Sequence, residues 1–432
     1  MAEEIPLAGF NSGRYRNVEP KHIQPARPEF SREINRRLLL NLIRTRQPLS
    51  RADLARVSGL ARCTVSTIIQ QLIADGWVTE GPTGRLPLGR RPTFLKLNDE
   101  RMIVGVDLKP MEATIALSDL TGHFGVQESI EMPPDQTAAM AQLISRIRRI
   151  VGSATGKSIE GIGVCLQGNR CAPTSRTLRR PDLNWSDFSV GACIADATGL
   201  AVDVDSAANA CALASAWFDN TKDGLGRVVV TVSEEIEAGI FTNGQLVHGL
   251  NGMAGDYGHV QLDPNGPGCE CGGRGCWTVF ASNGAALRYY TGPCPQTHGL
   301  TFFDLLNLAD RGDTSAVKAL ETMAYWLGIG FRMIVGGVAP DCIFVVGDLT
   351  RSWDRLTLSL MAGLTTQPLA DEQIPCIVPV LDGAAARLRG AVALVLQRRF
   401  AAWQEGWIRN TQEPRKYCER NQIEHPVSGP RL

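Results

Sequence analysis

The sequence of 432 residues has no excess charge of either sign, because 44 Lys and Arg residues balance 44 Asp and Glu residues. A balanced chain has no overall electrostatic attraction to nucleic acid or to a membrane, so any basic surface must be local. No apolar run approaches the ~18 residues that span a bilayer, and Met1 to Ile5 lack the basic-then-apolar order of a signal peptide. We therefore expect a cytoplasmic protein that does not bind membranes.

Cysteine, in contrast, is not scarce. The chain contains 12 cysteines, but in a long cytosolic protein these seldom form disulfides. Most lie within apolar runs, as Cys165, Cys211 and Cys342 do, and are predicted to be small core residues. The length predicts two to three domains with sizeable cores.

One cysteine cluster differs from the rest. Cys269, Cys271 and Cys276 lie in a glycine-rich stretch, and His259 precedes them by ten residues. Thiolates at this spacing can surround one ion, and a histidine completes the Cys3His tetrahedron of structural zinc. The sequence thus predicts one structural Zn²⁺ per chain. The alternative is three buried free cysteines in a glycine-rich loop.

The N-terminal quarter of the chain has the pattern of a DNA-binding domain. Residues 1–30 lack periodicity and predict a flexible tail. Residues 31–98 then predict three short helices, at 37–44, 51–57 and 61–75, followed by a strand pair. Ser50 and Asp53 form a capping box at the second helix, and Ser58-Gly59-Leu60 turns the chain toward the third. This order predicts a winged helix-turn-helix.

Residues at the start of the third helix are expected to enter the major groove, and arginines near Gly84 and Gly89 to reach phosphates or the minor groove. Ala61 precedes this helix and has no side chain that can cap it, at a cost of about 1 kcal/mol of local stability relative to a serine. The alternative is a helical dimerisation module with a solvated basic hairpin. The predicted DNA-binding residues are Arg51, Arg62, Thr64, Ser66, Thr67, Arg85, Arg90 and Arg91.

From Met102 onward strands and helices alternate, which predicts an α/β body. Residues 103–108 form an apolar strand, and residues 113–122 form a second strand that ends at a turn. The tail at 398–432 suggests no function.

The metal loop also resembles a known family. Gly255-Asp256-Tyr257-Gly258-His259, followed by Cys269-x-Cys271-Gly272-x-x-Gly275-Cys276, is similar to the signature of ROK proteins, the repressors and sugar kinases with an actin-like ATPase fold. The resemblance extends over about residues 35 to 397. It implies a first lobe at 102–222 that includes a returning helix near 384–397, and a second, zinc-containing lobe at 223–383.

Positions that catalyse phosphoryl transfer in the kinase relatives are changed. Their Gly-Gly-Thr turn is Lys109-Pro110-Met111 here, and their Gly-Thr-Gly-Ile-Gly loop is the acidic segment 233–237. Proline removes an amide donor, and carboxylates repel a triphosphate. The aspartate that serves as the kinase base corresponds to Ala207, which cannot accept a proton.

The resemblance therefore implies a DNA-binding transcriptional regulator, a repressor, without kinase activity. It would bind a double-stranded operator as a homodimer or homotetramer and respond to a sugar-like effector in its cleft. Asp256 and Thr278 replace the two glutamates that contact sugar in the kinases, which should weaken or retarget binding. The predicted ligand-binding residues are Asp182, Asn184, Asp205, Asn209, Asp256 and His259. The alternatives are an active sugar kinase with a DNA-binding arm and a ligand-independent regulator.

Overall fold

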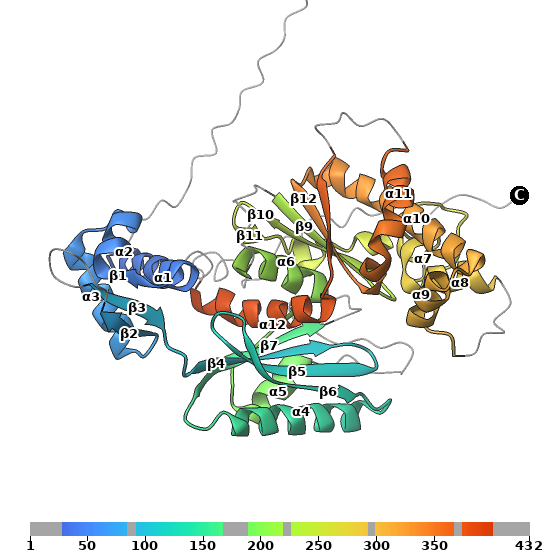
Figure 1. The fold of residues 1–432 in the computed structure, drawn as a ribbon. Helices are drawn as coiled ribbons and strands as arrows, with labels where there is room; N and C mark the ends of the chain where they lie inside the picture. The colour runs from blue at the N-terminus through green and yellow to red at the C-terminus, as the bar shows by residue number, and fades with distance from the viewer. Residues whose placement is uncertain are drawn as a thin grey trace, which may run out of the picture.

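The computed structural model describes residues 28–83, 92–166, 189–218, 226–292, 299–366 and 374–400. Figure 1 shows a small N-terminal domain beside a body of two lobes, each built on a mixed β-sheet. The predicted winged helix-turn-helix and α/β body are both present. No helix among the described residues is long and apolar enough to cross a membrane.

The N-terminal domain packs three helices against a small sheet of order β1-β3-β2. Its first helix begins at Pro28, so it includes three residues that the sequence analysis assigned to the flexible tail, and the remainder of that tail lies outside the described residues. The domain consists of α1 (Pro28–Arg46), β1 (Leu49–Ser50), α2 (Arg51–Ser58), α3 (Arg62–Ala74), β2 (Val78–Thr83) and β3 (Thr93–Leu97).

The first lobe has a five-stranded sheet of order β6-β5-β4-β7-β8, in which β4 pairs antiparallel with β5 and parallel with β7. Near-continuous apolar residues in β4 and β7 explain why these strands are central and buried on both faces. The elements are β4 (Arg101–Leu108), β5 (Glu112–Asp119), β6 (Phe124–Glu131), α4 (Gln136–Ser153), β7 (Ser158–Leu166), α5 (Val190–Thr198), β8 (Val202–Ser206) and α6 (Ala207–Phe218).

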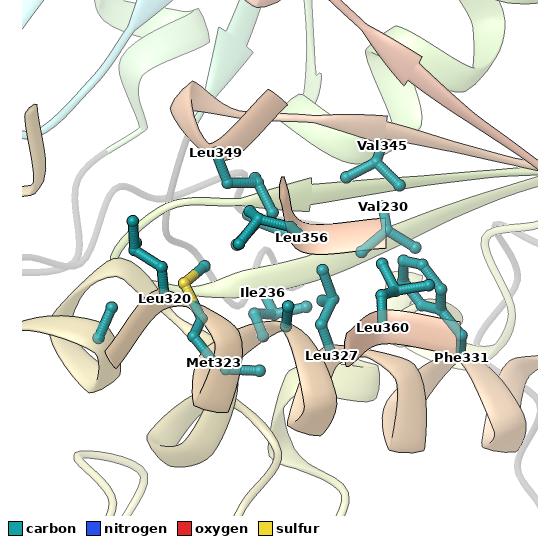
Figure 2. Close-up of a cluster of buried hydrophobic side chains, with 14 of the residues drawn as sticks. Val230, Ile236, Leu320, Met323, Leu327, Phe331, Val345, Leu349, Leu356 and Leu360 are labelled. Carbon is teal, nitrogen blue, oxygen red and sulfur yellow. The ribbon is translucent and has the colours of Figure 1, made fainter. Parts of the chain in front are cut away.

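The second lobe repeats this strand order as β11-β10-β9-β12-β13. Figure 2 shows its core, where Val230 and Val345 of the sheet face buried side chains of two long helices, including Leu327 and Leu360. Its elements are β9 (Gly226–Val232), β10 (Ile236–Thr242), β11 (Gln245–Leu246), η2 (Leu250–Gly252), η3 (Tyr257–His259), α7 (Thr278–Ala281), α8 (Asn283–Thr291), α9 (Phe302–Asp310), α10 (Thr314–Val338), β12 (Cys342–Val346), η4 (Asp348–Ser352), α11 (Trp353–Leu364), β13 (Cys376–Val380) and α12 (Gly383–Phe400).

The two lobes exchange their last helices. Helix α6 follows the first-lobe sheet but packs on β9 and β10 of the second, where Cys211 and Ala212 join a cluster with Val229. Helix α12 follows the second-lobe sheet and packs on β4 and β7 of the first. The two helices also pack on each other between the sheets (Figure 1). The chain passes from one lobe to the other at β8–α6 and at β13–α12. A change in the relative orientation of the lobes therefore requires a change in backbone conformation at these two junctions.

Helix α12 also joins the DNA-binding domain to the body. It extends to Phe400, three residues beyond the helix expected from sequence, and Phe400 packs edge-on against Trp77 and Trp217 at 5.7 and 5.8 Å between ring centroids. One hydrophobic cluster combines core residues of the N-terminal domain with Val392, Val395 and Leu396 of α12. The DNA-binding domain is therefore packed directly on the body.

Candidate functional site: a DNA-binding face, a metal loop and an altered cleft

The helix-turn-helix is built by local chemistry that the sequence predicts. The Ser50 side chain accepts a hydrogen bond from the Asp53 amide while the Asp53 carboxylate accepts from the Ser50 amide, which is the expected capping box. The Ser50 hydroxyl also donates to the Asp53 carboxylate at 2.6 Å, and this bond, followed by the one from the Ser50 amide, lowers the pKa of Asp53. Gly59 ends α2 in the left-handed region at φ 70°. Helix α3 begins at Arg62, and its N-cap residue Ala61 provides no side-chain cap, as expected.

Helix α3 presents the polar face predicted to read DNA. Arg62, Ser66 and Thr67 are exposed and Thr64 is half-buried, while its apolar residues form the domain core. Gln70 is also exposed and lies one turn beyond Ser66, so the same face is longer than the sequence analysis proposed. A helical-wheel projection would have found it.

Of the other predicted DNA-binding residues, only Arg51 is among the described residues. Arg51 forms an ion pair with Glu80 of β2, at 2.8 Å, on the partly exposed surface. Strand β2 ends at Thr83 and β3 begins at Thr93, which agrees with a wing between them. Arg85, Arg90 and Arg91 come between these two strands in the sequence and fall outside the described residues.

The four predicted metal ligands converge in the second lobe. Ligand atoms of His259, Cys269, Cys271 and Cys276 all lie within 4.8 Å of one another. The Cys269 Sγ is 3.5 Å from the His259 Nδ1, and the Cys271 Sγ is 3.6 Å from the Cys276 Sγ. A tetrahedral zinc site requires about 3.6 Å between nitrogen and sulfur and about 3.8 Å between sulfurs, as follows from its bond lengths. The donor set and its dimensions therefore fit Zn²⁺.

The backbone of this loop is tightly constrained. Gly275 has φ +62°, and a Cβ added there would lie 1.6 Å from the carbonyl oxygen of Asp263. The next residues anchor the loop in the lobe: Cys276 is 3 % exposed, and the buried Trp277 donates from Nε1 to the Trp326 carbonyl at 2.9 Å. Burial, together with the adjacent thiols, raises the pKa of Cys276 to about 12. A divalent cation reverses that electrostatic preference by stabilising the thiolates.

The predicted sugar-side residues come from both lobes. Asp205 is the penultimate residue of β8 and accepts a hydrogen bond from the Asn209 side chain of α6 at 3.0 Å. Asp256 precedes η3, which ends at the metal ligand His259, and Ala238 of β10 ties this loop to the sheet by donating to the Gly255 carbonyl. Asp182 and Asn184 lie outside the described residues.

The segments at the positions of the kinase phosphate loops form closed turns. Lys109 donates its amide to the Glu112 carbonyl in the turn between β4 and β5. Between β9 and β10, Ser233 donates its amide to the Glu235 carbonyl, so this donor is used within the acidic turn. Ala207, at the position of the kinase base, is 1 % exposed at the start of α6. Both segments therefore use a backbone donor within the turn, and the Ala207 side chain has no atom that accepts a proton.

A buried ion pair that the sequence analysis did not predict lies beside the first of these turns. Arg387 of α12 donates from Nε to the Asp107 carboxylate of β4 at 2.8 Å, and the Asp107 side chain is 2 % exposed. Burial alone would lower the pKa of Arg387, but the Asp107 carboxylate raises it above its ordinary value. The two residues are 280 positions apart, so no local motif could have indicated the pair.

A second unpredicted contact involves His248. Its imidazole Nε2 lies 2.8 Å from the Asp205 carboxylate, so it reaches a predicted ligand residue from the opposite lobe. His248 belongs to no recognised motif, and only the fold brings it to Asp205.

Comparisons with known proteins agree with this arrangement. The sequence pattern of the ROK family matches residues 103–398, and a winged helix-turn-helix DNA-binding pattern matches residues 32–79. The chain is 28 % identical over 342 residues to the xylose repressor of Bacillus subtilis (strain 168), covering 78 % of this chain and 88 % of the relative. It is 26 % identical over 381 residues to the DNA-binding transcriptional dual regulator NagC of Escherichia coli (strain K12), covering 85 % and 93 %.

Solved structures show the same fold. A ROK family transcriptional regulator, described as a homologue of the E. coli MLC protein, superposes with a TM-score of 0.71 at 25 % identity, covering 86 % of this chain and 99 % of that one. A ROK family glucokinase from Streptomyces griseus, in complex with glucose and AMPPNP, superposes with a TM-score of 0.59 at 23 % identity, covering 68 % and 99 %. The second likeness extends over a smaller share of this chain.

Proposed function

The chain belongs to the ROK family, and we propose that it is a DNA-binding transcriptional repressor whose body binds a sugar-like effector without phosphorylating it. One observation carries this proposal: a complete helix-turn-helix is packed onto a kinase-like body whose phosphate-binding turns are replaced. Relatives named as repressors cover 78 % and 85 % of this chain, which supports the same function.

We assign base recognition to Arg62, Thr64, Ser66 and Thr67, because α3 presents them at its exposed N-terminal half. Gln70 extends the same face. Phosphate or minor-groove contacts are assigned to the wing arginines Arg85, Arg90 and Arg91 and to Arg51. Arg51 must then exchange Glu80 for a phosphate, which costs little because the pair is partly exposed.

The effector is proposed to be a sugar or sugar derivative, bound between the lobes. The relatives are named for xylose and N-acetylglucosamine, so a pentose and an amino sugar are the first candidates. The proposed contacts are the oxygen- and nitrogen-bearing side chains Asp182, Asn184, Asp205, Asn209, Asp256 and His259. Lobe closure would change the spacing of two DNA-binding domains across a palindromic operator, which requires a homodimer or homotetramer.

The metal loop is proposed to hold one structural Zn²⁺. Four protein ligands complete a tetrahedron and leave no position for water or substrate, so the ion supplies rigidity and no catalysis. Because His259 lies three residues after Asp256, holding its imidazole also holds the loop that faces the effector.

Loss of kinase activity is proposed from three local features acting together. The turn at 109–111 contains proline, the acidic turn at 233–237 repels phosphate, and Ala207 cannot accept a proton. Beside the first turn, the Oδ2 of the Asp107 carboxylate accepts from Arg387, which places a guanidinium at this end of β4.

Selection of bound sequences from random DNA, followed by titration of the recovered operator, tests this function. We expect a palindromic operator. We also expect Arg62→Ala to lose about 1 to 3 kcal/mol of binding free energy at one base position. Arg149→Ala, an exposed arginine of the body, is the matched control and should leave affinity unchanged. Absence of any selected sequence, or equal losses in both variants, would refute the proposal.

A further inference from the structure

His248 connects the two lobes at the cleft. It follows β11 of the second lobe, and its Nε2 lies 2.8 Å from the Asp205 Oδ2 at the end of β8 in the first lobe. An ionised carboxylate can only accept hydrogen bonds, so the imidazole Nε2 is the donor. The pair therefore joins the two lobes with a charge-assisted hydrogen bond.

The acceptor is held firmly on the first-lobe side. The Asp205 Oδ1 accepts from the Ser206 amide at 2.8 Å and from the Asn209 side chain at 3.0 Å. Burial alone would raise the pKa of Asp205, but the hydrogen bond and charge of His248, together with these donors, lower it. The Asp205 carboxylate is therefore ionised, and its side chain is only 14 % exposed. From the second lobe, the His248 imidazole contacts this carboxylate.

Both partners of this pair lie in segments that connect the lobes to the predicted site residues. Asp205 lies immediately before Ser206 and Ala207, where the chain passes from the first-lobe sheet into α6, the helix that packs on the second lobe. On the other side, Ala254 donates its amide to the His248 carbonyl at 3.0 Å and closes the loop that leads to Asp256 and the metal loop. One hydrogen bond therefore joins a chain crossing to the segment that carries effector and metal residues.

We propose that His248 is a positioning residue of the effector site, which holds Asp205 across the cleft until a polyhydroxylated ligand takes the carboxylate and displaces the imidazole. This inference rests on the proposed function, because it concerns the same cleft. A sugar hydroxyl is a suitable competitor, since it can donate to the same carboxylate oxygen. The contact then sets the effector concentration at which the lobes rearrange, because the competent state must first lose it.

Hydrogen exchange of the full-length protein without DNA or sugar tests the contact itself. His248→Ala should accelerate amide exchange at Ser206 to Asn209 by about five- to tenfold, since the charge-assisted bond that closes this junction is lost. His248→Gln should restore most of the protection, because its side-chain amide can also donate to Asp205. His123→Ala is the matched control: it removes an exposed imidazole from Asp119 within one lobe and should leave the junction unchanged.

Titration with D-xylose and N-acetyl-D-glucosamine, monitored by release of the selected operator, tests the competition. For a sugar that releases wild-type protein, His248→Ala should lower the midpoint by about fivefold or more, because Asp205 is already available. A higher midpoint would mean that His248 binds the sugar directly, and unchanged exchange at Ser206 to Asn209 would mean that the contact does not hold the junction. Either result overturns the inference without affecting operator binding, whereas failure to select an operator affects only the proposed function.

Discussion

Two regions of the body differ in how closely they match the ROK kinase pattern. One is the metal loop, and the other, here called the nucleotide side, comprises the turns at 109–111 and 233–237 with Ala207. In the metal loop, all four ligand types and their spacing match the ROK signature, and the four ligand atoms converge within 4.8 Å. On the nucleotide side, the strands and turns keep their places, but the turns contain proline and carboxylates, and Asp107 is paired with Arg387. The metal loop therefore keeps both its fold and the ligand residues of the ROK signature. The nucleotide side keeps its strands and turns, but its residues differ from those of the kinases.

The difference agrees with the proposed role of the body as an effector sensor. A sensor needs lobes of fixed shape and a ligand site that can rearrange, and a structural metal supplies the first. It does not need phosphate binding, and Arg387 supplies the counter-charge for the buried Asp107 carboxylate through its Oδ2. Four experiments test the difference between the two sites.

The largest expected effect concerns the ion pair on the nucleotide side. Arg387→Met leaves the Asp107 carboxylate buried and unpaired, so it should lower the free energy of unfolding by about 4 kcal/mol. The double variant Asp107→Leu with Arg387→Met should recover most of the loss, because no charge remains to be buried. Urea unfolding measures both. The exposed pair of Arg355 with Asp310 is the control, and Arg355→Met should cost less than about 1 kcal/mol.

Removal of a metal ligand should have the next largest effect. Cys271→Ser should release about one zinc per chain, detected by elemental analysis, and destabilise the body. With free zinc at a hundredfold excess over its Kd, the lost stabilisation is about 2.7 kcal/mol. The N-terminal domain should remain folded and DNA binding should hardly change, while any effector response weakens. Cys376→Ser, an exposed thiol of the same lobe, should leave the zinc content and the Tm unchanged. Native protein without zinc would contradict the assignment.

A smaller effect should follow when the ligands stay and only the loop backbone changes. In Gly275→Ala the new Cβ meets the Asp263 carbonyl oxygen at 1.6 Å, so the loop must shift and zinc affinity should fall by about 10- to 100-fold. Gly268→Ala is a control within the same loop, because its Cβ would have nothing within 4 Å. Competition with a zinc chelator measures both. Equal affinities would show that ligand identity alone, and not loop geometry, defines the site.

Local features were predictable from sequence because neighbouring residues determine them. The capping box at Ser50, the turn at Gly59 and the spacing of Cys269 to Cys276 each depend on a few adjacent positions. The exchange of α6 and α12 between lobes, and the contacts of His248 and Arg387, depend on residues 43 to 280 positions apart. Such contacts leave no periodicity and involve single polar residues, so the fold must be known before they can be identified.

The smallest expected effect is the response to nucleotide, which should be absent. Mg-ATP at millimolar concentration should shift the Tm by less than about 1 °C, because a ligand present below its Kd adds almost no stability. The acidic turn between β9 and β10 disfavours a triphosphate, and Ala207 cannot take a proton from a sugar hydroxyl. A coupled assay with common hexoses should accordingly show no ADP production above background. Zinc-loaded protein should be used, so that a negative result reflects the nucleotide side and not a damaged metal loop. Turnover that depends on both hexose and ATP, and that disappears when Asp205 is replaced by Asn, would show that the nucleotide side has kept its chemistry after all.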